Sequence, residues 1–179
     1  EPFLMNDIIL FKKIKKILDN LNIVLKFYNS TLLWEPYSIL KNDDSPYKVF
    51  TPFYRRGCLG RLNPNYPLGD CEEIDFLDVR NDTKIQDLEL LDKYKWYDKF
   101  ETLWKISENS ALDILQEFLQ GSISNYKVGR DFPSSNYNSR LSPYIRFGMI
   151  SINRIWWEVN KLNPDKNVEH YKSELGWRE

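Results

Sequence analysis

Apolar residues recur at helical spacing from about residue 106 to 179, and this pattern limits the fold most strongly. Asn109 or Ser110 is expected to cap the first helix of this stretch, and Gly121 is expected to end it. The residues expected on the inner face of this helix are Ala111, Leu112, Leu115, Phe118 and Leu119.

More helices are expected beyond Gly121. Ser142 precedes Pro143, which is the usual order of an N-cap and a first helical residue, and Ser151 is expected to cap the next helix. The Asn-Pro-Asp sequence at 163–165 should end that helix, and a last one is predicted from Val168 onward. The whole stretch is therefore predicted to be all-α. The residues expected to face inward after Ser151 are Ile152, Ile155, Trp156 and Val159.

Residues 1–35 have the pattern of one helix followed by one strand. Asn6 or Asp7 can cap the helix, and Ile23 to Tyr28 is a short, largely apolar run that is typical of a strand. One helix and one strand cannot close an α/β layer, so its other strands are expected upstream. We interpret 1–35 as the C-terminal end of an α/β, Rossmann-like domain. The apolar residues at helical spacing are Leu10, Ile14, Ile17, Leu18 and Leu21.

Residues 36–105 differ in composition from both flanking parts. They hold five of the nine prolines and three of the seven glycines, which argues against long regular elements. One short helix is predicted, with Thr51 as its N-cap and Pro52 as its first residue. We therefore predict a mixed but mostly helical fold in three parts, with domain boundaries at 1–35, 36–105 and 106–179.

The composition narrows the kinds of site to expect. The net charge is −1, so a DNA-binding role needs a local basic face. Cys58 and Cys71 lack metal-ligand spacing and His170 is the single histidine, so no metal site is expected, and reduced thiols suit a cytoplasmic protein. Aromatic residues make up 15% of the chain, and most are expected in the core; the alternative is that some line a site for a flat ligand such as a flavin or a nucleobase. No stretch is long and apolar enough to predict a membrane span, and both ends have the pattern of cuts within a longer protein.

The segment 138–142 combines two hydroxyls, an amide and a guanidinium directly before a predicted helix. A helix N-terminus offers free N–H groups and the positive end of the helix dipole, and Ser139 and Arg140 add donors for an anion. The pattern predicts a phosphate site without identifying the phosphate compound. From spacing alone, a plainer alternative is favoured, in which Ser142 caps its helix and Ser139 and Arg140 are loop surface.

Four segments together resemble the photolyase and cryptochrome family. The sequence Asn-Ser-Arg-Leu-Ser-Pro-Tyr-Ile-Arg-Phe-Gly at 138–148 is similar to that family's Thr-Ser-Arg-Leu-Ser-Pro-Tyr-x-x-x-Gly signature. Residues 46–54 resemble the stretch that leads into its interdomain connector, 129–133 resemble the loop before its flavin site, and 173–179 resemble its Glu-Leu-x-Trp-Arg-Glu helix. The resemblance covers essentially the whole chain, and the chain looks most like an internal fragment of a class I cyclobutane pyrimidine dimer photolyase.

The resemblance implies a fold and a cofactor. The family has an N-terminal α/β antenna domain, a long connector and an all-helical domain that holds FAD in a U-shaped conformation. A second antenna chromophore is possible, and its identity stays open. Asn138 stands where the family usually has Thr, although an amide can still donate and accept hydrogen bonds. The positions that the resemblance assigns to flavin binding are Tyr126, Asn138, Ser139, Arg140, Leu141, Ser142, Tyr171 and Arg178.

The resemblance assigns the last helix to the damaged base. Glu174 and Trp177 fall on the family's catalytic positions, where the Trp stacks on a flipped-out pyrimidine dimer and the Glu hydrogen-bonds its carbonyl groups. Arg130 and Arg178 join these two as DNA-binding positions. A protonated Glu174 is a hypothesis for the donor that stabilises the transient radical anion. Without the motif, an ordinary ion pair between Glu174 and Arg178 would be favoured.

The implied reaction is the light-driven repair of cyclobutane pyrimidine dimers in DNA, by electron transfer from reduced FAD. The expected partner is UV-damaged DNA, and a monomer without membrane contact is expected. Three alternatives remain: a cryptochrome photoreceptor, a (6-4) photolyase and a helical protein-binding module without cofactor. Glu174 and Trp177 favour repair of pyrimidine dimers among them. The 179 residues alone are expected to bind FAD weakly or not at all and to be inactive.

Overall fold

The computed structural model describes residues 5–26, 28–29, 31–61, 63–69, 73, 75, 83–91 and 94–179, with the side chains of Pro36 and Glu101 left out. Within these residues the protein is mostly helical, with eight α-helices, four short 3₁₀ or π segments and no strand. The chain divides into two compact units, one formed by residues 1–64 with 176–179 and the other by residues 65–175. We refer to them as unit 1 and unit 2. The three-part division expected from the sequence stays a prediction.

Unit 1 begins with helix α1, Met5–Asn20. This confirms the predicted helix, but Asn6 and Asp7 lie inside it, so neither is the expected cap. None of its described residues is buried, and Ile17, on the predicted apolar face, has an exposed fraction of 58%. The predicted helix is therefore confirmed, while Leu10, Ile17 and Leu21 of its apolar face are exposed and Ile14 and Leu18 are half-buried.

The predicted strand at Ile23 to Tyr28 is wrong for its described residues. Residues 23–26 and 28 have no strand conformation, and Phe27 lies outside the described residues. A strand is stabilised by hydrogen bonds to a neighbouring strand. The described part of this chain offers no such neighbour, so an apolar run alone does not produce a strand.

The connector region of unit 1 contains η1 (Pro36–Ser38), α2 (Phe50–Pro52) and the π-helical turn η2 (Phe53–Cys58). The predicted helix at this point exists, but Thr51 is not its cap. Val49 occupies the N-cap position with extended backbone angles and no side-chain cap. Pro52 is tolerated because N–H groups in the first turn of a helix lack an intrahelical partner.

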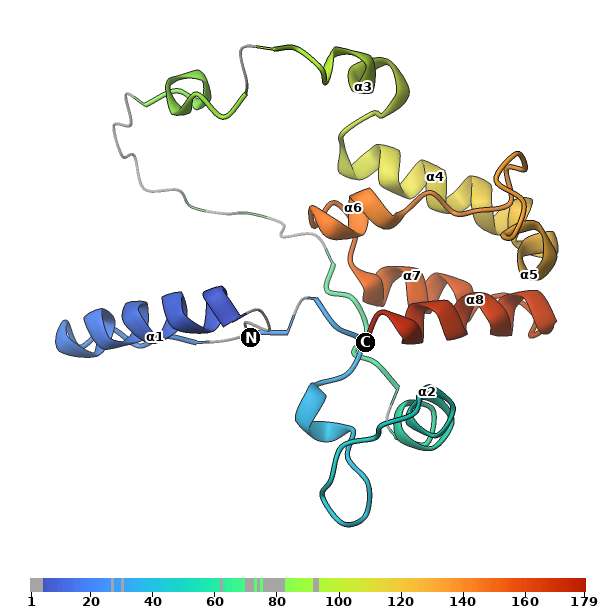
Figure 1. Ribbon diagram of the computed structural model, residues 1–179, viewed down its shortest axis with the longest axis horizontal. Helices are drawn as coiled ribbons and strands as arrows, with labels where there is room; N and C mark the ends of the chain where they lie inside the picture. The colour runs from blue at the N-terminus through green and yellow to red at the C-terminus, as the bar shows by residue number, and fades with distance from the viewer. Residues whose placement is uncertain are drawn as a thin grey trace. The chain divides into compact units, whose positions relative to one another are not determined.

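Unit 2 contains most of the helices, which Figure 1 draws from green to red. Two short elements, η3 and α3, precede the longer α4. The bounds are η3 Ile85–Leu88, α3 Asp98–Leu103, α4 Glu108–Gln120, η4 Ser122–Asn125, α5 Tyr126–Gly129, α6 Ser142–Arg146, α7 Ile152–Val159 and α8 Lys166–Trp177. The last two residues of α8 belong to unit 1.

The ends of α4 confirm one prediction and correct another. Gly121 is the C-cap, as predicted. The N-cap is Ser107, whose hydroxyl accepts a hydrogen bond from the Ser110 backbone N–H at 3.1 Å. Asn109 and Ser110 therefore lie within the first turn, because a cap accepts from the N–H groups that follow it.

Of the predicted caps of α6 and α7, one is confirmed and one is wrong. Ser151 caps α7 as predicted, and its hydroxyl accepts from the Arg154 N–H at 3.1 Å. Ser142 is the first residue of α6, and Leu141 occupies the N-cap position without a side-chain cap. The expected cap was therefore one residue too late, and the helix runs straight on from the buried Leu141.

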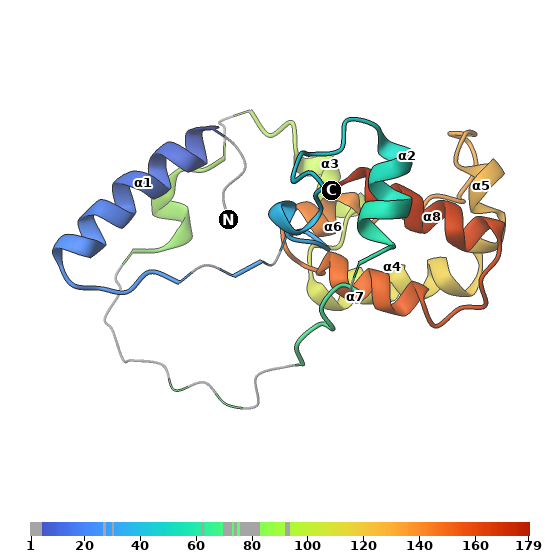
Figure 2. The ribbon, with the colours of Figure 1, turned by 90° about the horizontal axis from the view of Figure 1, so that it is seen from below.

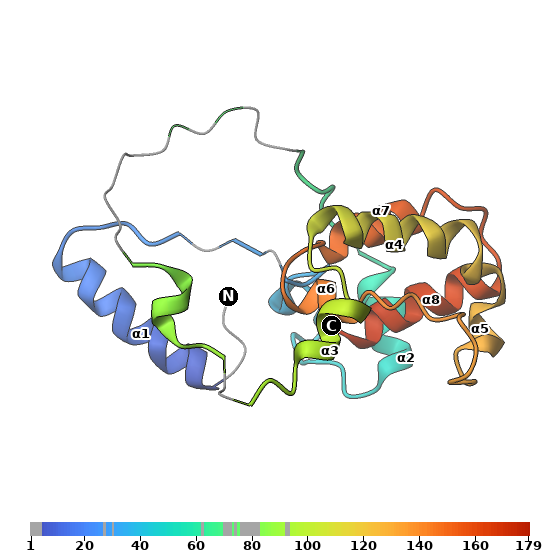
Figure 3. The same cartoon turned by 90° about the horizontal axis from the view of Figure 1, so that it is seen from above.

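The core of unit 2 lies between α4, α7 and α8. The ring of Phe118 on α4 lies 4.7 Å from that of Tyr171 on α8, and the ammonium of Lys172 on α8 lies 5.0 Å from the ring centroid of Trp156 on α7. The three helix axes run in similar directions, as Figures 2 and 3 show from opposite sides. Each fully buried large apolar side chain contributes about 1.5–3 kcal/mol.

The predicted inner faces are largely confirmed. Ile152, Ile155, Trp156 and Val159 are all buried. On α4 the buried residues are Ala111, Leu115 and Phe118, whereas Leu112 has an exposed fraction of 39%. None of the described helices is long and apolar enough to cross a membrane.

Candidate functional site

The loop before α6 presents Ser139 and Arg140 at the surface of unit 2. Arg140 has a left-handed backbone, with φ of 56°, which turns the chain sharply between its neighbours. The next residue, Leu141, is buried with an exposed fraction of 1%. Leu141 therefore anchors the loop in the core, while the turn leaves the Arg140 side chain exposed.

Helix α6 is fixed in turn by Tyr144. Its buried ring leaves the hydroxyl free to donate a hydrogen bond to the backbone carbonyl of Lys105, at 2.9 Å. This bond connects α6 to the segment that precedes α4. The loop and α4 consequently form two walls of one pocket.

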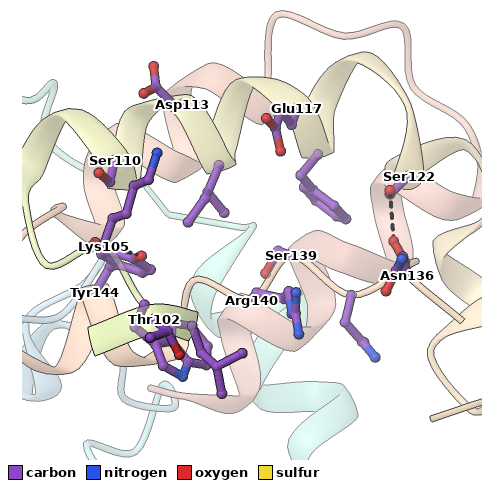
Figure 4. A pocket seen from close by; sticks show the side chains of 15 residues that line it. Thr102, Lys105, Ser110, Asp113, Glu117, Ser122, Asn136, Ser139, Arg140 and Tyr144 are labelled. Carbon is purple, nitrogen blue, oxygen red and sulfur yellow. Dashed lines mark hydrogen bonds between the residues drawn. The ribbon is translucent and has the colours of Figure 1, made fainter. Parts of the chain in front are cut away.

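The pocket has a volume of about 460 Å³ and opens between the 102–105 segment, α4 and the loop at 138–140. Figure 4 shows its side chains, with Glu117 on α4 pointing toward the loop that carries Ser139 and Arg140, and Asp113 at the outer edge of the α4 wall. Three of the residues that the sequence assigned to flavin binding line it, namely Asn138, Ser139 and Arg140.

The charges in the pocket are mixed. Lys105 and Arg140 supply two cations, and Asp113 and Glu117 supply two carboxylates. The Arg140 guanidinium lies 5.9 Å from the ring centroid of Trp104 and forms no ion pair within the described part of the chain. Its N–H groups therefore remain available to an anionic ligand.

Behind this pocket lies a cluster of three aromatic rings, Phe118, Tyr126 and Tyr171. The ring of Tyr171 lies 4.9 Å from that of Tyr126, nearly at right angles. Burial is the main cause that raises the pKa of each of the two tyrosines. Tyr171 also has a hydrogen bond with Ser139, which lowers its pKa in part. That bond connects the wall of the pocket to the core.

The buried Asn167 holds the aromatic cluster in register with α8. Its amide nitrogen donates to the Ser124 carbonyl at 2.6 Å, and its amide oxygen accepts from the Lys127 N–H at 3.1 Å. These bonds flank Tyr126 on both sides in sequence. A buried amide that is satisfied on both ends fixes the position of the short α5.

Arg130 and Glu174 form an ion pair within unit 2. Their side chains have exposed fractions of 30% and 26%, and the bond to Glu174 is the main cause that raises the pKa of Arg130. The Nε2 atom of His170 lies 3.8 Å from the same carboxylate oxygen. The fold thus brings together two residues that the sequence assigned to DNA binding. His170 was missed, although its i,i+4 spacing to Glu174 signals the contact.

Trp177 and Arg178 belong to unit 1. The Trp177 indole stacks on the ring of Phe50, with centroids 3.8 Å apart and planes 10° apart, yet its exposed fraction is 61%. Arg178 lies beyond the end of α8, donates to the Thr31 carbonyl at 2.6 Å and pairs with Glu179 at 3.6 Å. Glu174 and Arg178 thus each have other partners, so the plain alternative of an ion pair between them gains no support.

Five residues assigned to flavin binding do not line the pocket. Leu141, Tyr126 and Tyr171 are buried, Ser142 is exposed at the start of α6, and Arg178 lies in unit 1. The sequence also missed the wall that α4 and the segment before it provide. The missed polar residues of that wall are Lys105, Ser110, Asp113 and Glu117.

Comparison with known proteins finds no family model that matches. The deoxyribodipyrimidine photo-lyase of Agrobacterium fabrum is 30% identical over 94% of this chain and 36% of its own length, and that of Alkalihalophilus pseudofirmus is 33% identical over 85% of this chain and 32% of its own length. A crystal structure of a class III photolyase from Agrobacterium tumefaciens matches 99% of this chain and 38% of its own, with a TM-score of 0.88 at 27% identity. Over most of its length the chain is therefore similar to part of the deoxyribodipyrimidine photo-lyases.

The photolyase match confirms the resemblance drawn from the sequence motifs. The chain spans about a third of the length of the curated photolyases that it matches. Those relatives are named as enzymes, the deoxyribodipyrimidine photo-lyases. The matching crystal structure is that of a class III photolyase, so the closer resemblance to class I stays a prediction.

Proposed function

We propose that this chain is part of a deoxyribodipyrimidine photolyase and that its pocket receives the diphosphate of FAD. The observation that carries the proposal is the placement of Ser139 and Arg140 on one wall of the pocket, with the Arg140 guanidinium exposed and without an ion pair among the described residues. The photolyase names of the curated relatives support the same function.

The polar residues of the pocket suit the central part of a dinucleotide, which consists of the diphosphate and the adjoining sugar hydroxyls. Arg140 offers a fork of N–H donors to a diphosphate, and Lys105 adds a second cation on the same pocket. Asp113 and Glu117 disfavour an anion beside α4, but carboxylates accept hydrogen bonds from sugar hydroxyls. The diphosphate is therefore assigned to the loop wall and the hydroxyl-bearing part of the ligand to the α4 wall.

When bound, reduced FAD supplies the electron that light drives into the pyrimidine dimer. The protein's own share is to hold its ligand and to support the loop. Leu141 keeps the loop anchored, and the bond between Ser139 and Tyr171 fixes the hydroxyl that faces the pocket. A preorganised wall lowers the entropy that binding would otherwise cost.

The lesion side of the proposal rests on Trp177 and Glu174. The exposed indole of Trp177 offers a face to an unstacked base, and such stacking contributes about 1–3 kcal/mol per base. Glu174 now forms an ion pair with Arg130, whereas the donor role requires a protonated carboxyl. The donor hypothesis therefore needs Arg130 to leave Glu174 when DNA binds. A pH–rate profile that is the same for wild type and Glu174→Gln would contradict it.

Arg140 provides the test of the flavin site. In the complete protein that carries this chain, Arg140→Ala should lose most of its co-purified flavin, and Arg140→Lys should keep a part of it, because lysine retains the charge but not the fork. Arg146→Ala is the matched control, since Arg146 is exposed on α6 and does not line the pocket. Equal flavin content in the Arg140→Ala and Arg146→Ala proteins would refute the assignment.

Activity on DNA separates repair from signalling. Illumination of the flavin-loaded protein with irradiated DNA should remove cyclobutane dimers and leave (6-4) products in place. Light-dependent change of the protein without dimer loss would support the cryptochrome alternative instead.

A further inference from the structure

A shallow depression on unit 1 gathers basic side chains. Its volume is about 600 Å³, and Lys41, Arg56 and Arg61 line it together with Gly60. Two of the three cations are held by local hydrogen bonds. Arg61 donates to the Leu40 carbonyl at 3.2 Å, and the Lys41 ammonium donates to the Ser45 hydroxyl at 3.1 Å. The depression is therefore partly preorganised.

Arg56 is the available cation of this depression. It lies exposed in the π-helical turn η2 and has no hydrogen bond or ion pair among the described residues. Asp43, the acidic residue of the lining, is already engaged. Its carboxylate accepts from the Ser45 hydroxyl at 2.6 Å and from the Ser45 N–H at 3.1 Å, and these bonds lower its pKa.

The charge around the depression contrasts with the rest of the chain. Residues 41–61 contain five basic and two acidic residues, whereas the remainder contains twenty basic and twenty-four acidic residues. A local excess of positive charge in a nearly neutral chain marks a surface for an anionic partner.

The same helical segment carries an exposed stacking site. Phe50, in α2, supports the Trp177 indole, and Arg56 follows six residues later in η2. Surfaces that hold unstacked bases combine such cations with aromatic platforms.

We propose that the depression lined by Lys41, Arg56 and Arg61 binds a backbone phosphate of DNA, on the strand whose base stacks on Trp177. The proposal rests on the proposed function for the base at Trp177. It adds a sequence-independent contact that positions the strand, with Arg56 as the residue that forms it.

The test measures how salt weakens the binding of the complete protein to an undamaged DNA duplex, by fluorescence anisotropy. Each phosphate contact contributes about 0.9 to the slope of log affinity against log salt. Arg56→Gln should lower that slope by about one and weaken binding on the order of fivefold near physiological salt. Arg56→Lys should retain most of the slope.

Lys12→Gln is the matched control, because Lys12 is an exposed lysine on α1 and the substitution removes the same charge from the same unit. If Lys12→Gln and Arg56→Gln change the slope equally, the effect is diffuse electrostatics and the site is refuted. An unchanged slope in Arg56→Gln, with an unchanged thermal unfolding midpoint, refutes it as well. A wild-type protein without flavin whose DNA affinity still depends on Arg56 would contradict the proposed function and support the phosphate site.

Discussion

Replacing Phe50 tests whether the stack beneath Trp177 matters for a bound base. Phe50 lies between two rings, with the Trp177 indole at 3.8 Å and the Tyr54 ring at 5.5 Å, and both pairs of planes are within 10° of parallel. Gly176 permits this arrangement, because a Cβ atom there would lie 2.5 Å from the Tyr54 ring. The stack should hold the indole in one orientation although 61% of Trp177 is exposed.

The expected magnitude follows from the pairwise stacking energy. An aromatic pair contributes about 0.5–1.5 kcal/mol beyond the area that it buries. Phe50→Leu keeps an apolar side chain but removes the ring, so the orientation of the indole should be lost. We expect the preference for dimer-containing over undamaged DNA to fall by roughly 2- to 12-fold, with 1.4 kcal/mol counted as tenfold.

The assay is a pair of anisotropy titrations of the complete protein, with one oligonucleotide that contains a pyrimidine dimer and one that does not. Phe53→Leu is the matched control, since Phe53 lies in the same helical segment and its ring is 6.5 Å from Phe50 in a tilted contact. A Phe50→Leu protein with undiminished preference for the dimer would refute the reasoning. A rise in that preference would show that Phe50 covers the face that the base needs.

Two further predictions concern stability and the pocket wall. Burial raises the pKa of Glu179 from 4.5 to about 7, which corresponds to about 3 kcal/mol. The folded state therefore binds the proton more tightly, so this stability is present below pH 4.5 and is lost as the pH rises through 7. Urea unfolding should show this decline in wild type and not in Glu179→Gln, and parallel profiles would contradict it. Tyr171→Phe removes the bond to Ser139 but keeps the ring beside Phe118. It should lower the free energy of unfolding by about 1 kcal/mol and weaken flavin binding a few-fold. Equal flavin affinity of the two proteins would show that Ser139 needs no such support.

The spacing of apolar residues predicted most of the helices, whereas the capping residues predicted their first residues less accurately. Gly121 and Ser151 were identified because a terminal glycine and a capping serine act on their immediate neighbours. Ser107 was missed because Asn109 and Ser110 are equally good capping types, and only the backbone path decides which one precedes the first turn. Residues 23–28 show the converse limit, since a strand depends on partners that a local pattern does not contain.

The site was predictable only on the side that carries a contiguous motif. Asn138, Ser139 and Arg140 stand in one run and line the pocket together. The opposite wall comes from α4, where Asp113 and Glu117 look in sequence like any solvent-facing helix residues. Long-range contacts were equally hidden. The ion pair of Arg130 with Glu174 joins residues 44 positions apart, and no local pattern in the sequence predicts it.

The most direct test of the account is the flavin content of the complete purified protein, followed by illumination with irradiated DNA. The account predicts close to one FAD per chain and a light-dependent loss of pyrimidine dimers that Trp177→Ala and Arg140→Ala both diminish. A well-folded protein that carries no flavin and leaves the dimers unchanged under blue light would contradict it.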